Sequence, residues 1–343
     1  MPVYNADNYL DASINSILNQ TYKNFEFIIV CSDPTKTTEK ILEKYSSIDP
    51  RILVFYQEKK GIIFARNFGC QLARGEFIAV MDADDISGSN RFETQLLFME
   101  KNPDIGILGS WADRINDRGI VTNTIRYPTR PFGIGWCLIF ENCMMHLTIL
   151  MRKSILKDLQ YYSHEKNGFP EDYDLWTRAF FVTKIANLPI VLSQSRAHLT
   201  NNSISVKYEM TQFDNILRNE FLQKLFKQEF QNFLKEAGLQ MNSDIFTFNI
   251  DCNDKQVRFI EDLYRLYIHR YDVTPQDLME IRSSLAIFLL RYSFAMVRYS
   301  KKRALILLCK SIHYLNSISF EIIIRALWIR LKGSNKIFIY RSR

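Results

Sequence analysis

The chain has 343 residues, of which 47% are hydrophobic, and a formal net charge of +7 at neutral pH. This composition excludes a disordered chain and is sufficient for one large domain or two smaller ones. The six cysteines lack C-x-x-C spacing, which argues against a zinc site or a disulfide framework, and no apolar run reaches the roughly 18 residues that a bilayer requires. Because Met1 is followed directly by Pro2, with no charged or apolar leader, we expect a cytoplasmic protein.

Short apolar strands alternate with amphipathic helices along the first 110 residues. Helices are expected over residues 10–18, 35–45, 62–73 and 92–101, and strands over residues 25–30, 52–56, 77–81 and 105–110. Asn5 or Asp7 is expected to cap the first helix. The alternation predicts an α/β fold with a mostly parallel, doubly wound sheet flanked by helices, whose strand-to-helix loops meet at one edge.

Three carboxylates, Asp82, Asp84 and Asp85, come directly after the strand expected at residues 77–81. Open α/β sheets bind ligands at the carboxyl ends of their strands. Carboxylates clustered there repel one another, which indicates hydration, a basic neighbour or a bound cation. The alternative is an acidic turn that caps the helix starting near Arg91. Spacing alone leaves both interpretations open.

The pattern changes twice in the remainder of the chain. Irregular sequence is expected at residues 127–140, strands at 146–152 and 190–195, and a helix from Pro170 whose first turn holds Glu171 and Asp172, where the helix dipole favours carboxylates. From about residue 206 long helices are expected, at residues 213–233, 255–269, 275–297, 303–314 and 318–331. We therefore predict an α/β domain over residues 1–205 and a helical, basic C-terminal region over residues 206–343.

Basic residues are concentrated near the end of the sequence. From Arg291 onward twelve Lys or Arg stand against one acid, Glu321, and they are interleaved with Leu, Ile, Phe and Trp328. This pattern favours contact with an anionic membrane surface, so the protein is expected to be peripheral on the inner face of the membrane. The alternative is a helical subdomain with a solvated basic face. No nucleic-acid motif accompanies the charge, so nucleic acid is not an expected partner.

Several stretches, in this order, resemble the family 2 glycosyltransferases of the GT-A fold. They are Pro2-Val3-Tyr4-Asn5 with residues 16–22, residues 25–30, Ala65-Arg66-Asn67 with Gly69, residues 73–76, residues 81–85, and Glu171-Asp172 with Trp176. The resemblance covers about residues 1–205, which would make them the catalytic domain. It implies an inverting, metal-dependent enzyme of surface polysaccharide or lipid-linked glycan synthesis. Such an enzyme moves a sugar from a nucleotide-diphosphate donor to a hydroxyl of a saccharide or lipid-linked saccharide acceptor.

The resemblance also implies roles for individual residues. Asp84 would be the principal ligand of Mn²⁺ or Mg²⁺, with Asp82 beside it at the donor and sharing the metal. Asp172 would be the general base and Glu171 would shape the acceptor site. The other residues expected to contact the donor are Pro2, Val3, Tyr4, Ser32, Arg66 and Ala83, and His198 is expected near the diphosphate or a flexible loop.

Two features depart from the family's pattern. Cys31-Ser32 stand where the family usually has acidic residues that read the nucleotide base, and the family's first apolar strand is missing before Pro2. Loss of a central parallel strand would expose backbone edges, so we expect either a start farther upstream or an impaired protein. The alternative function is a catalytically impaired relative that acts as a binding or interaction protein. A phosphatase-like hydrolase is a further alternative, although the sequence has no Gly-rich phosphate loop.

Overall fold

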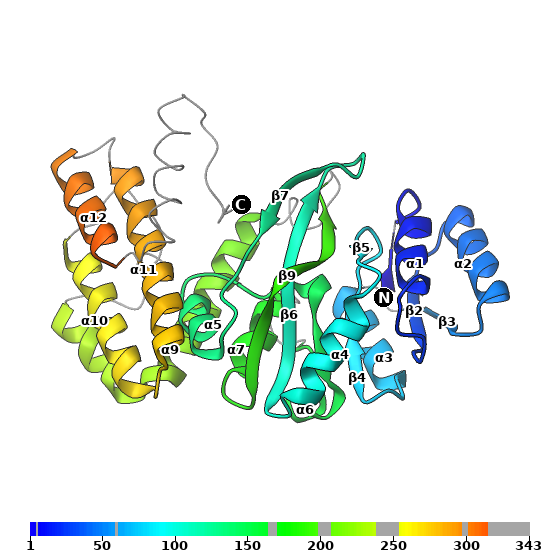
Figure 1. Ribbon diagram of the computed structural model, residues 1–343, viewed down its shortest axis with the longest axis horizontal. Coiled ribbons are helices and arrows are strands. Elements are labelled where there is room, and N and C mark those ends of the chain that lie inside the picture. The colour runs from blue at the N-terminus through cyan, green and yellow to red at the C-terminus, as the bar shows by residue number, and fades with distance from the viewer. Residues whose placement is uncertain are drawn as a thin grey trace. The chain divides into compact units, whose positions relative to one another are not determined.

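The computed structural model describes residues 1–4, 6–58, 61–163, 170–197, 207–237, 254–296 and 301–314. The chain divides into two compact units (Figure 1). The first joins residues 1–129 to residues 142–213, and the second joins Arg130–Glu141 to the described helical sequence from Asp214 onward. The domain boundary expected near residue 205 lies outside the described residues.

The first unit begins with a three-stranded parallel sheet of order β1-β2-β3. Its strands are β1 (Pro2–Val3), β2 (Phe27–Ser32) and β3 (Ile52–Gln57), and the helices of this segment are α1 (Leu10–Leu18), α2 (Lys36–Ile48) and α3 (Ile62–Leu72). The predicted order of helices and strands is confirmed here, although β2 begins and ends two residues later than expected. Every β2 residue is buried, in agreement with its continuous apolar sequence.

The predicted cap of α1 is wrong for Asp7. Tyr9 stands at the cap position of α1, and in the described residues this helix has no capping hydrogen bond from a side chain. The Asp7 carboxylate instead accepts hydrogen bonds from the Thr35 hydroxyl, at 2.9 Å, and from the Thr38 hydroxyl. Thr35 itself caps α2, since its side chain accepts from the Thr38 backbone N–H at 3.1 Å. Asp7 therefore ties the loop after β1 to the start of α2. Asn5 lies outside the described residues.

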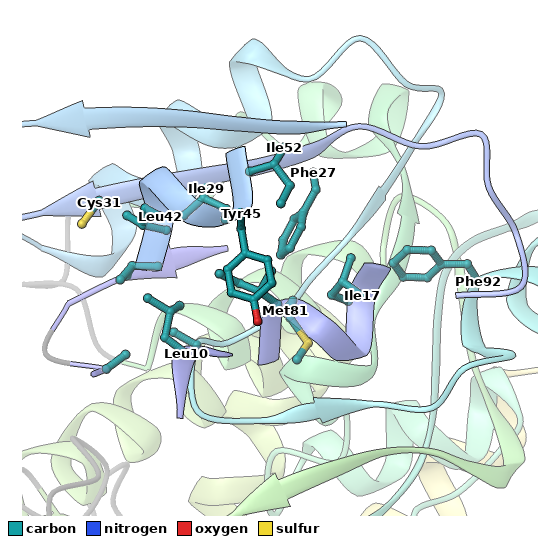
Figure 2. Close-up of a cluster of buried hydrophobic side chains, with 14 residues drawn as sticks. Leu10, Ile17, Phe27, Ile29, Cys31, Leu42, Tyr45, Ile52, Met81 and Phe92 are labelled. Carbon is teal, nitrogen blue, oxygen red and sulfur yellow. The ribbon is translucent and has the colours of Figure 1, made fainter. Parts of the chain in front are cut away.

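A buried apolar cluster joins α1, α2 and the first sheet to the acidic run (Figure 2). Its members from the helices and strands include Leu10, Ile14, Ile17, Phe27, Ile29, Cys31, Leu42, Tyr45 and Ile52. Met81 and Ala83 pack in the same cluster. The two residues between which Asp82 stands are therefore buried against the first sheet. This packing fixes the acidic run beside the ends of β1 and β2.

The second sheet of this unit has the order β4-β8-β6-β9-β5, with β7 paired to β6. Its strands are β4 (Phe77–Ala79), β5 (Ile86–Ser87), β6 (Ile105–Ile115), β7 (Val121–Ile125), β8 (Leu150–Arg152) and β9 (Lys184–Arg196). The accompanying helices are α4 (Arg91–Lys101), η1 (His146–Thr148), α6 (Lys153–Asp158) and α7 (Glu171–Ala179). Among the described strands of this sheet, only β6 and β9 pair in parallel, and β4 pairs antiparallel with β8. The predicted α/β fold class is confirmed. The division of the strands into two separate sheets was not predicted, because the alternation of helices and strands along the sequence does not show which strands pair.

A cavity of about 690 Å³ is lined by residues of both sheets. β2 contributes Phe27 and Ile28, and β4 with the residue after it contributes Phe77–Val80. Met1 also lines the cavity, and its amino group donates a hydrogen bond to the Ile28 carbonyl oxygen at 2.8 Å. Burial lowers the pKa of this amino group to about 6.

The second unit is helical. It contains α5 (Pro131–Leu138), most of α9 (Lys207–Ala237), α10 (Asp254–Arg270), α11 (Pro275–Met296) and α12 (Lys301–Tyr314). α9 is interrupted at Lys227, whose φ is 47°. The long helices predicted up to residue 314 are confirmed, whereas the helix expected at residues 318–331 lies outside the described residues. Among the helices described, none has the length and apolar character needed to cross a membrane.

Candidate active site

The acidic run forms a loop between β4 and β5 whose backbone is anchored to α1. The Ser13 hydroxyl, which is fully buried, lies 2.8 Å from the carbonyl oxygen of Ala83 and 2.7 Å from that of Asp85, and its single O–H is shared between these two acceptors. Ser13 follows the helical spacing of Leu10, Ile14 and Ile17, and so lies on the buried side of α1. A buried serine at this position therefore holds the backbone of the loop.

Arg196, the last residue of β9, anchors the same loop from the other side. Its backbone N–H donates to Asp85 Oδ1 at 2.7 Å, and its Nε donates to the carbonyl oxygen of Asp84 at 3.0 Å. The guanidinium also lies over the Tyr9 ring, 4.6 Å from the ring centroid. α1 and β9 together fix the backbone from which the acidic side chains project.

The three aspartates of the run have different environments. Asp85 is 5% exposed, and burial, together with Asp84 and Asp82, raises its pKa well above the ordinary value. Asn90 stands at the cap position of α4 and no side chain caps this helix. The interpretation of Asp85 as a helix cap is therefore wrong, because its carboxylate binds the backbone of β9. Asp82 and Asp84 are only partly buried.

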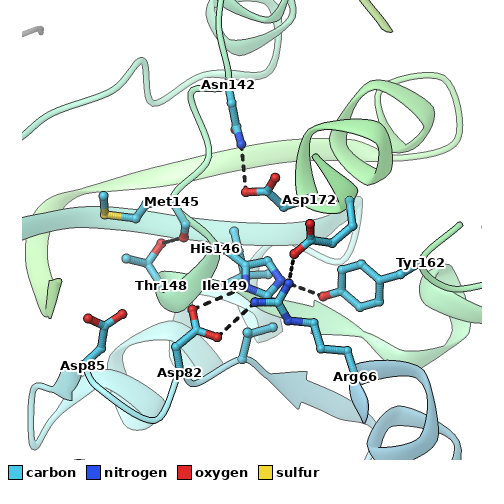
Figure 3. Close-up of polar contacts among 12 residues, drawn as sticks. Arg66, Asp82, Asp85, Asn142, Met145, His146, Thr148, Ile149, Tyr162 and Asp172 are labelled. Atoms are coloured by element: carbon cyan, nitrogen blue, oxygen red, sulfur yellow. Dashed lines mark hydrogen bonds and ion pairs between the residues drawn. The ribbon is translucent and has the colours of Figure 1, made fainter. Parts of the chain in front are cut away.

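Arg66 connects the acidic loop to the start of α7 (Figure 3). Its Nη2 lies 3.0 Å from Asp82 Oδ1, and its Nη1 forms an ion pair with Glu171. The Arg66 side chain is only 7% exposed. Burial opposes the charge on Arg66, but Asp82 and Glu171 outweigh it and raise the pKa of the guanidinium. The resemblance to the family placed all three residues in one site, and the fold brings them into contact.

The two carboxylates paired with Arg66 respond differently. Burial favours the neutral acid at Asp82, but Arg66, followed by His146, lowers the pKa of Asp82 below its ordinary value. At Glu171 burial dominates and raises the pKa; Arg66 opposes this shift and Asp172 adds to it. Asp82, which belongs to the acidic loop, is therefore ionised at neutral pH.

His146 and Tyr162 lie next to the ion pair of Arg66 and Asp82. His146 Nδ1 lies 3.8 Å from Asp82 Oδ2, and His146 Nε2 lies 2.9 Å from the Tyr162 hydroxyl. Asn67, next to Arg66 on α3, holds Tyr162 with two hydrogen bonds, 2.9 Å from its Nδ2 to the Tyr162 carbonyl oxygen and 3.0 Å from the Tyr162 N–H to its Oδ1. α3 thus carries both the Arg66 guanidinium and Asn67, which positions the Tyr162 ring beside it.

Asp172 lies in the first turn of α7 and is partly buried. Its Oδ2 accepts a hydrogen bond from Asn142 Nδ2 at 2.8 Å, and its Oδ1 accepts from the Tyr173 backbone N–H at 2.7 Å. The N-terminal turn of a helix favours an ionised carboxylate. Glu171 and Asp172 are therefore adjacent but differently bound, the first by a cation and the second by neutral donors.

The residues expected on the donor side lie at the ends of the first sheet. Val3 is buried in β1, and the Tyr4 side chain that follows is 54% exposed. Ser32 ends β2 and is buried, and its hydroxyl accepts a hydrogen bond from Gln57 Nε2 at 2.8 Å. Ala83 packs in the same apolar cluster as Val3. His198 lies outside the described residues.

Carboxylates suited to a divalent cation are present in the acidic loop, although no group of three or more His, Cys, Asp or Glu arranged as a metal site occurs in the described part of the chain. Mn²⁺ and Mg²⁺ at diphosphates need only one or two protein carboxylates, because the substrate supplies further oxygens. Arg66 binds the Asp82 side chain, and Arg196 holds the backbone of Asp84. The loop therefore offers the carboxylate oxygens that such a cation takes.

Sequence reasoning missed three contributors to this site. Asn142 lies in sequence expected to precede a strand, Tyr162 lies in a segment without a motif, and His146 lies where a strand rather than η1 was expected. Each belongs to a loop or a 3₁₀ turn, and each meets its partner over a separation of at least 16 residues. The sequence pointed to this part of the site only through Asn67, the partner of Tyr162, because Asn67 adjoins Arg66 in the stretch Ala65-Arg66-Asn67.

Comparison with known proteins identifies the family of the chain. The family model "Glycosyl transferase family 2" matches residues 1–160. A glycosyltransferase of Haemophilus influenzae is 27% identical over 310 residues, which cover 86% of this chain and 93% of that protein. The Escherichia coli UDP-Glc:alpha-D-GlcNAc-diphosphoundecaprenol beta-1,3-glucosyltransferase WfgD is 33% identical over 208 residues, which cover 60% of this chain and 78% of WfgD. The chain belongs to the family 2 glycosyltransferases.

Two solved structures share the fold. S. aureus TarS 1-349 in complex with UDP-GlcNAc matches with a TM-score of 0.53 at 16% identity, over 90% of this chain and 88% of the TarS 1-349 chain. The mannosyltransferase PcManGT of Pyrobaculum calidifontis, in complex with GDP-Man and Mn²⁺, matches with a TM-score of 0.50 at 14% identity, over 96% of this chain and 79% of that protein. The predicted GT-A fold and the predicted enzyme class, a glycosyltransferase, are confirmed.

Proposed function

We propose that the chain is an inverting, metal-dependent glycosyltransferase that moves a sugar from a nucleotide-diphosphate donor to an acceptor hydroxyl. The observation that carries the proposal is the pairing of Arg66 with Asp82 on one side and Glu171 on the other. This pairing joins the acidic loop, which suits a donor and its cation, to the α7 turn, which suits an acceptor. A donor and an acceptor must lie side by side for the reaction.

On the donor side, Asp84 would hold the cation, with Asp82 beside it. A divalent cation there would stabilise the negative charge that develops on the diphosphate leaving group. Tyr4 offers an exposed ring for stacking on the nucleotide base, and Pro2, Val3, Ser32 and Ala83 would line the donor site. Arg66 keeps Asp82 ionised and so maintains the negative charge of the loop.

On the acceptor side, Asp172 would act as the general base. A hydroxyl is a weak nucleophile, so a carboxylate must take its proton as the new bond forms. Asp172 is partly exposed, whereas Glu171 is 8% exposed and bound to Arg66, so Asp172 is the carboxylate of the pair that a hydroxyl reaches. Attack opposite the leaving group would invert the anomeric configuration. Glu171 would shape the acceptor site.

The acceptor class and the location of the protein follow from the same reasoning. WfgD acts on a GlcNAc linked to diphosphoundecaprenol, and this supports a lipid-linked glycan or a surface polysaccharide as the product here. The basic C-terminal sequence would hold the protein at an anionic membrane surface, near such an acceptor.

The test is turnover of a panel of nucleotide sugars with Mn²⁺, by the wild-type protein and by Asp84→Ala. We expect Asp84→Ala to lose about a hundredfold in rate or more, since stabilisation by a metal is worth several kcal/mol. Asp104→Ala, which removes an exposed carboxylate paired with Lys184, is the matched control and should retain the wild-type rate. Equal turnover by wild type and Asp84→Ala would refute the metal assignment. Absence of donor binding in the wild type would favour the impaired binding protein, and release of phosphate from simple monoesters would favour a hydrolase.

A further inference from the structure

Asn142 lies in the loop between α5 and η1 and donates a hydrogen bond to Asp172 from outside α7 (Figure 3). Its Oδ1 accepts a hydrogen bond from the Met144 backbone N–H at 3.1 Å. Because a backbone N–H can only donate, the amide oxygen of Asn142 must face Met144 and the NH₂ group must face Asp172. The local backbone therefore fixes the direction of the hydrogen bond to the carboxylate.

The loop that carries Asn142 is itself firmly placed. Cys143 and Met144 are 0% and 1% exposed. The carbonyl oxygen of Cys143 accepts a hydrogen bond from Asn187 Nδ2 on β9 at 3.3 Å. A buried residue pair thus anchors the loop to the sheet, and Asn142 has the support that a side chain needs to position another group.

Within the described residues, each oxygen of Asp172 accepts one hydrogen bond, Oδ2 from Asn142 and Oδ1 from Tyr173 N–H. Each carboxylate oxygen has two acceptor positions, so both retain one for a substrate hydroxyl. The protein donors are neutral, in contrast to the guanidinium that binds Glu171. Asp172 is therefore held in one orientation while its negative charge is left uncompensated by these two donors.

We propose that Asn142 is a positioning residue for Asp172 in sugar transfer. This inference rests on the proposed function, in which Asp172 is the general base. In that step the acceptor O–H bond breaks and its proton moves to Asp172, while the hydroxyl oxygen forms the new bond to the anomeric carbon. The bond between the anomeric carbon and the diphosphate oxygen breaks, and its electron pair leaves on the diphosphate. Asn142 takes no proton and touches no reacting atom. It keeps the accepting oxygen directed at the hydroxyl.

The test is a double-mutant cycle on transfer to acceptor, with Asn142→Ala, Asp172→Asn and the double variant. Misplacing a catalytic group costs rate rather than donor affinity, so we expect Asn142→Ala to lower kcat about tenfold or more with the KM for the donor unchanged. In the Asp172→Asn background the same substitution should change the residual rate by less than about twofold, because Asn142 acts through Asp172. Asn142→Gln, which keeps an NH₂ donor, should recover part of the lost rate.

Asn102→Ala is the matched control, since Asn102 is also partly buried and also donates its amide at 2.8 Å, to the Phe98 carbonyl oxygen in α4. It should leave kcat unchanged, and thermal unfolding should show that all variants are folded. An equal loss from Asn142→Ala in both backgrounds would show a structural role and overturn the inference while leaving the proposed function intact. If Asp172→Asn alone transfers sugar at the wild-type rate, the assignment of the base fails, and the role of Asn142 fails with it.

Discussion

Arg66 Nη2 lies 3.0 Å from Asp82 Oδ1, inside a site where the Arg66 side chain is only 7% exposed. Arg66 belongs to α3 and Asp82 follows β4, so this ion pair fixes the position of the acidic loop relative to a helix that precedes it. The second carboxylate on Arg66, Glu171, comes from α7. One buried cation thus fixes three separate segments of the chain.

Replacing Arg66 should therefore destabilise the fold. Arg66→Ala leaves Asp82 and Glu171 without their cation, and breaking a buried pair in this way costs about 3–5 kcal/mol. Urea denaturation would measure this as a lower free energy of unfolding. Arg74→Ala is the matched control, because Arg74 also pairs with a glutamate but its side chain is 80% exposed, and it should cost less than about 1 kcal/mol. Similar losses in the two variants would show that the buried pair contributes little.

The buried carboxylate of Asp85 predicts a dependence of stability on pH. Its pKa is raised in the folded protein, while an unfolded aspartate titrates near pH 3.9. The folded state therefore binds this proton more tightly, and the contribution of Asp85 to stability is present below about pH 4 and is lost as the pH rises toward the raised pKa.

Asp85→Asn removes this titration but keeps an oxygen that accepts from the Arg196 N–H. We expect the variant to gain stability relative to wild type as the pH rises from about 4 to about 7.5, because in the wild type the unfolded state releases the Asp85 proton while the folded state retains it. Urea denaturation of both proteins at the two pH values would measure the difference. A difference in unfolding free energy that stays constant with pH would contradict the assignment of a raised pKa.

Ser13 predicts an effect of the loop anchor that can be separated from catalysis. Ser13→Ala leaves the Ala83 and Asp85 carbonyl oxygens without their buried donor, and an unsatisfied buried polar group costs about 1–3 kcal/mol. Ser47→Ala is the matched control on α2, where an exposed hydroxyl donates to the Lys44 carbonyl oxygen, and should change stability by less than about 0.5 kcal/mol. Thermal unfolding would compare the two. Equal Tm values would exclude Ser13 as an anchor.

The basic C-terminal sequence predicts salt-sensitive binding to anionic lipid. The full chain should sediment with phosphatidylglycerol vesicles at low ionic strength and should be released as salt screens the attraction. Vesicles of phosphatidylcholine alone are the control. Equal binding to both kinds of vesicle, or none to either, would favour a solvated basic face.

The sequence was sufficient to predict the helices and strands that have a clear local pattern of apolar residues. α1, α2 and α3 have apolar residues at helical spacing, and β2 and β3 are short apolar runs, so their boundaries were predicted within about three residues. β9 was predicted at only about half its length, because its first part includes polar Asn187 and Pro189. Pairing with β6 in the tertiary structure extends this strand beyond its local pattern.

α5 shows that the local sequence can also fail to predict a helix. Gly133 and Gly135 disfavour a helix, and irregular sequence was expected here, yet Ile134, Trp136 and Leu138 are completely buried within the second unit. A Cβ at Gly133 would lie 2.9 Å from the Cβ of Glu280 on α11, so the close packing of these two helices favours a glycine at this position. Tertiary packing outweighs local propensity here.

The candidate site was predictable only where residue types form recognisable stretches. Arg66, Asp82, Glu171 and Asp172 were found because each stands in such a stretch, and the fold explains the contacts that three of them make. Asn142 was not predicted, because its hydrogen bond to Asp172 spans 30 residues and depends on a loop anchored by buried neighbours.

The most direct test of the proposed mechanism is single-turnover transfer by Asp172→Asn, measured together with donor binding by calorimetry in the presence of Mn²⁺. We expect donor affinity to match wild type and transfer to fall about 10²- to 10⁴-fold, which is the usual contribution of a general base. Asp158→Asn, an exposed aspartate at the end of α6, should behave as wild type in both measurements. Transfer by Asp172→Asn at the wild-type rate would contradict the proposed mechanism.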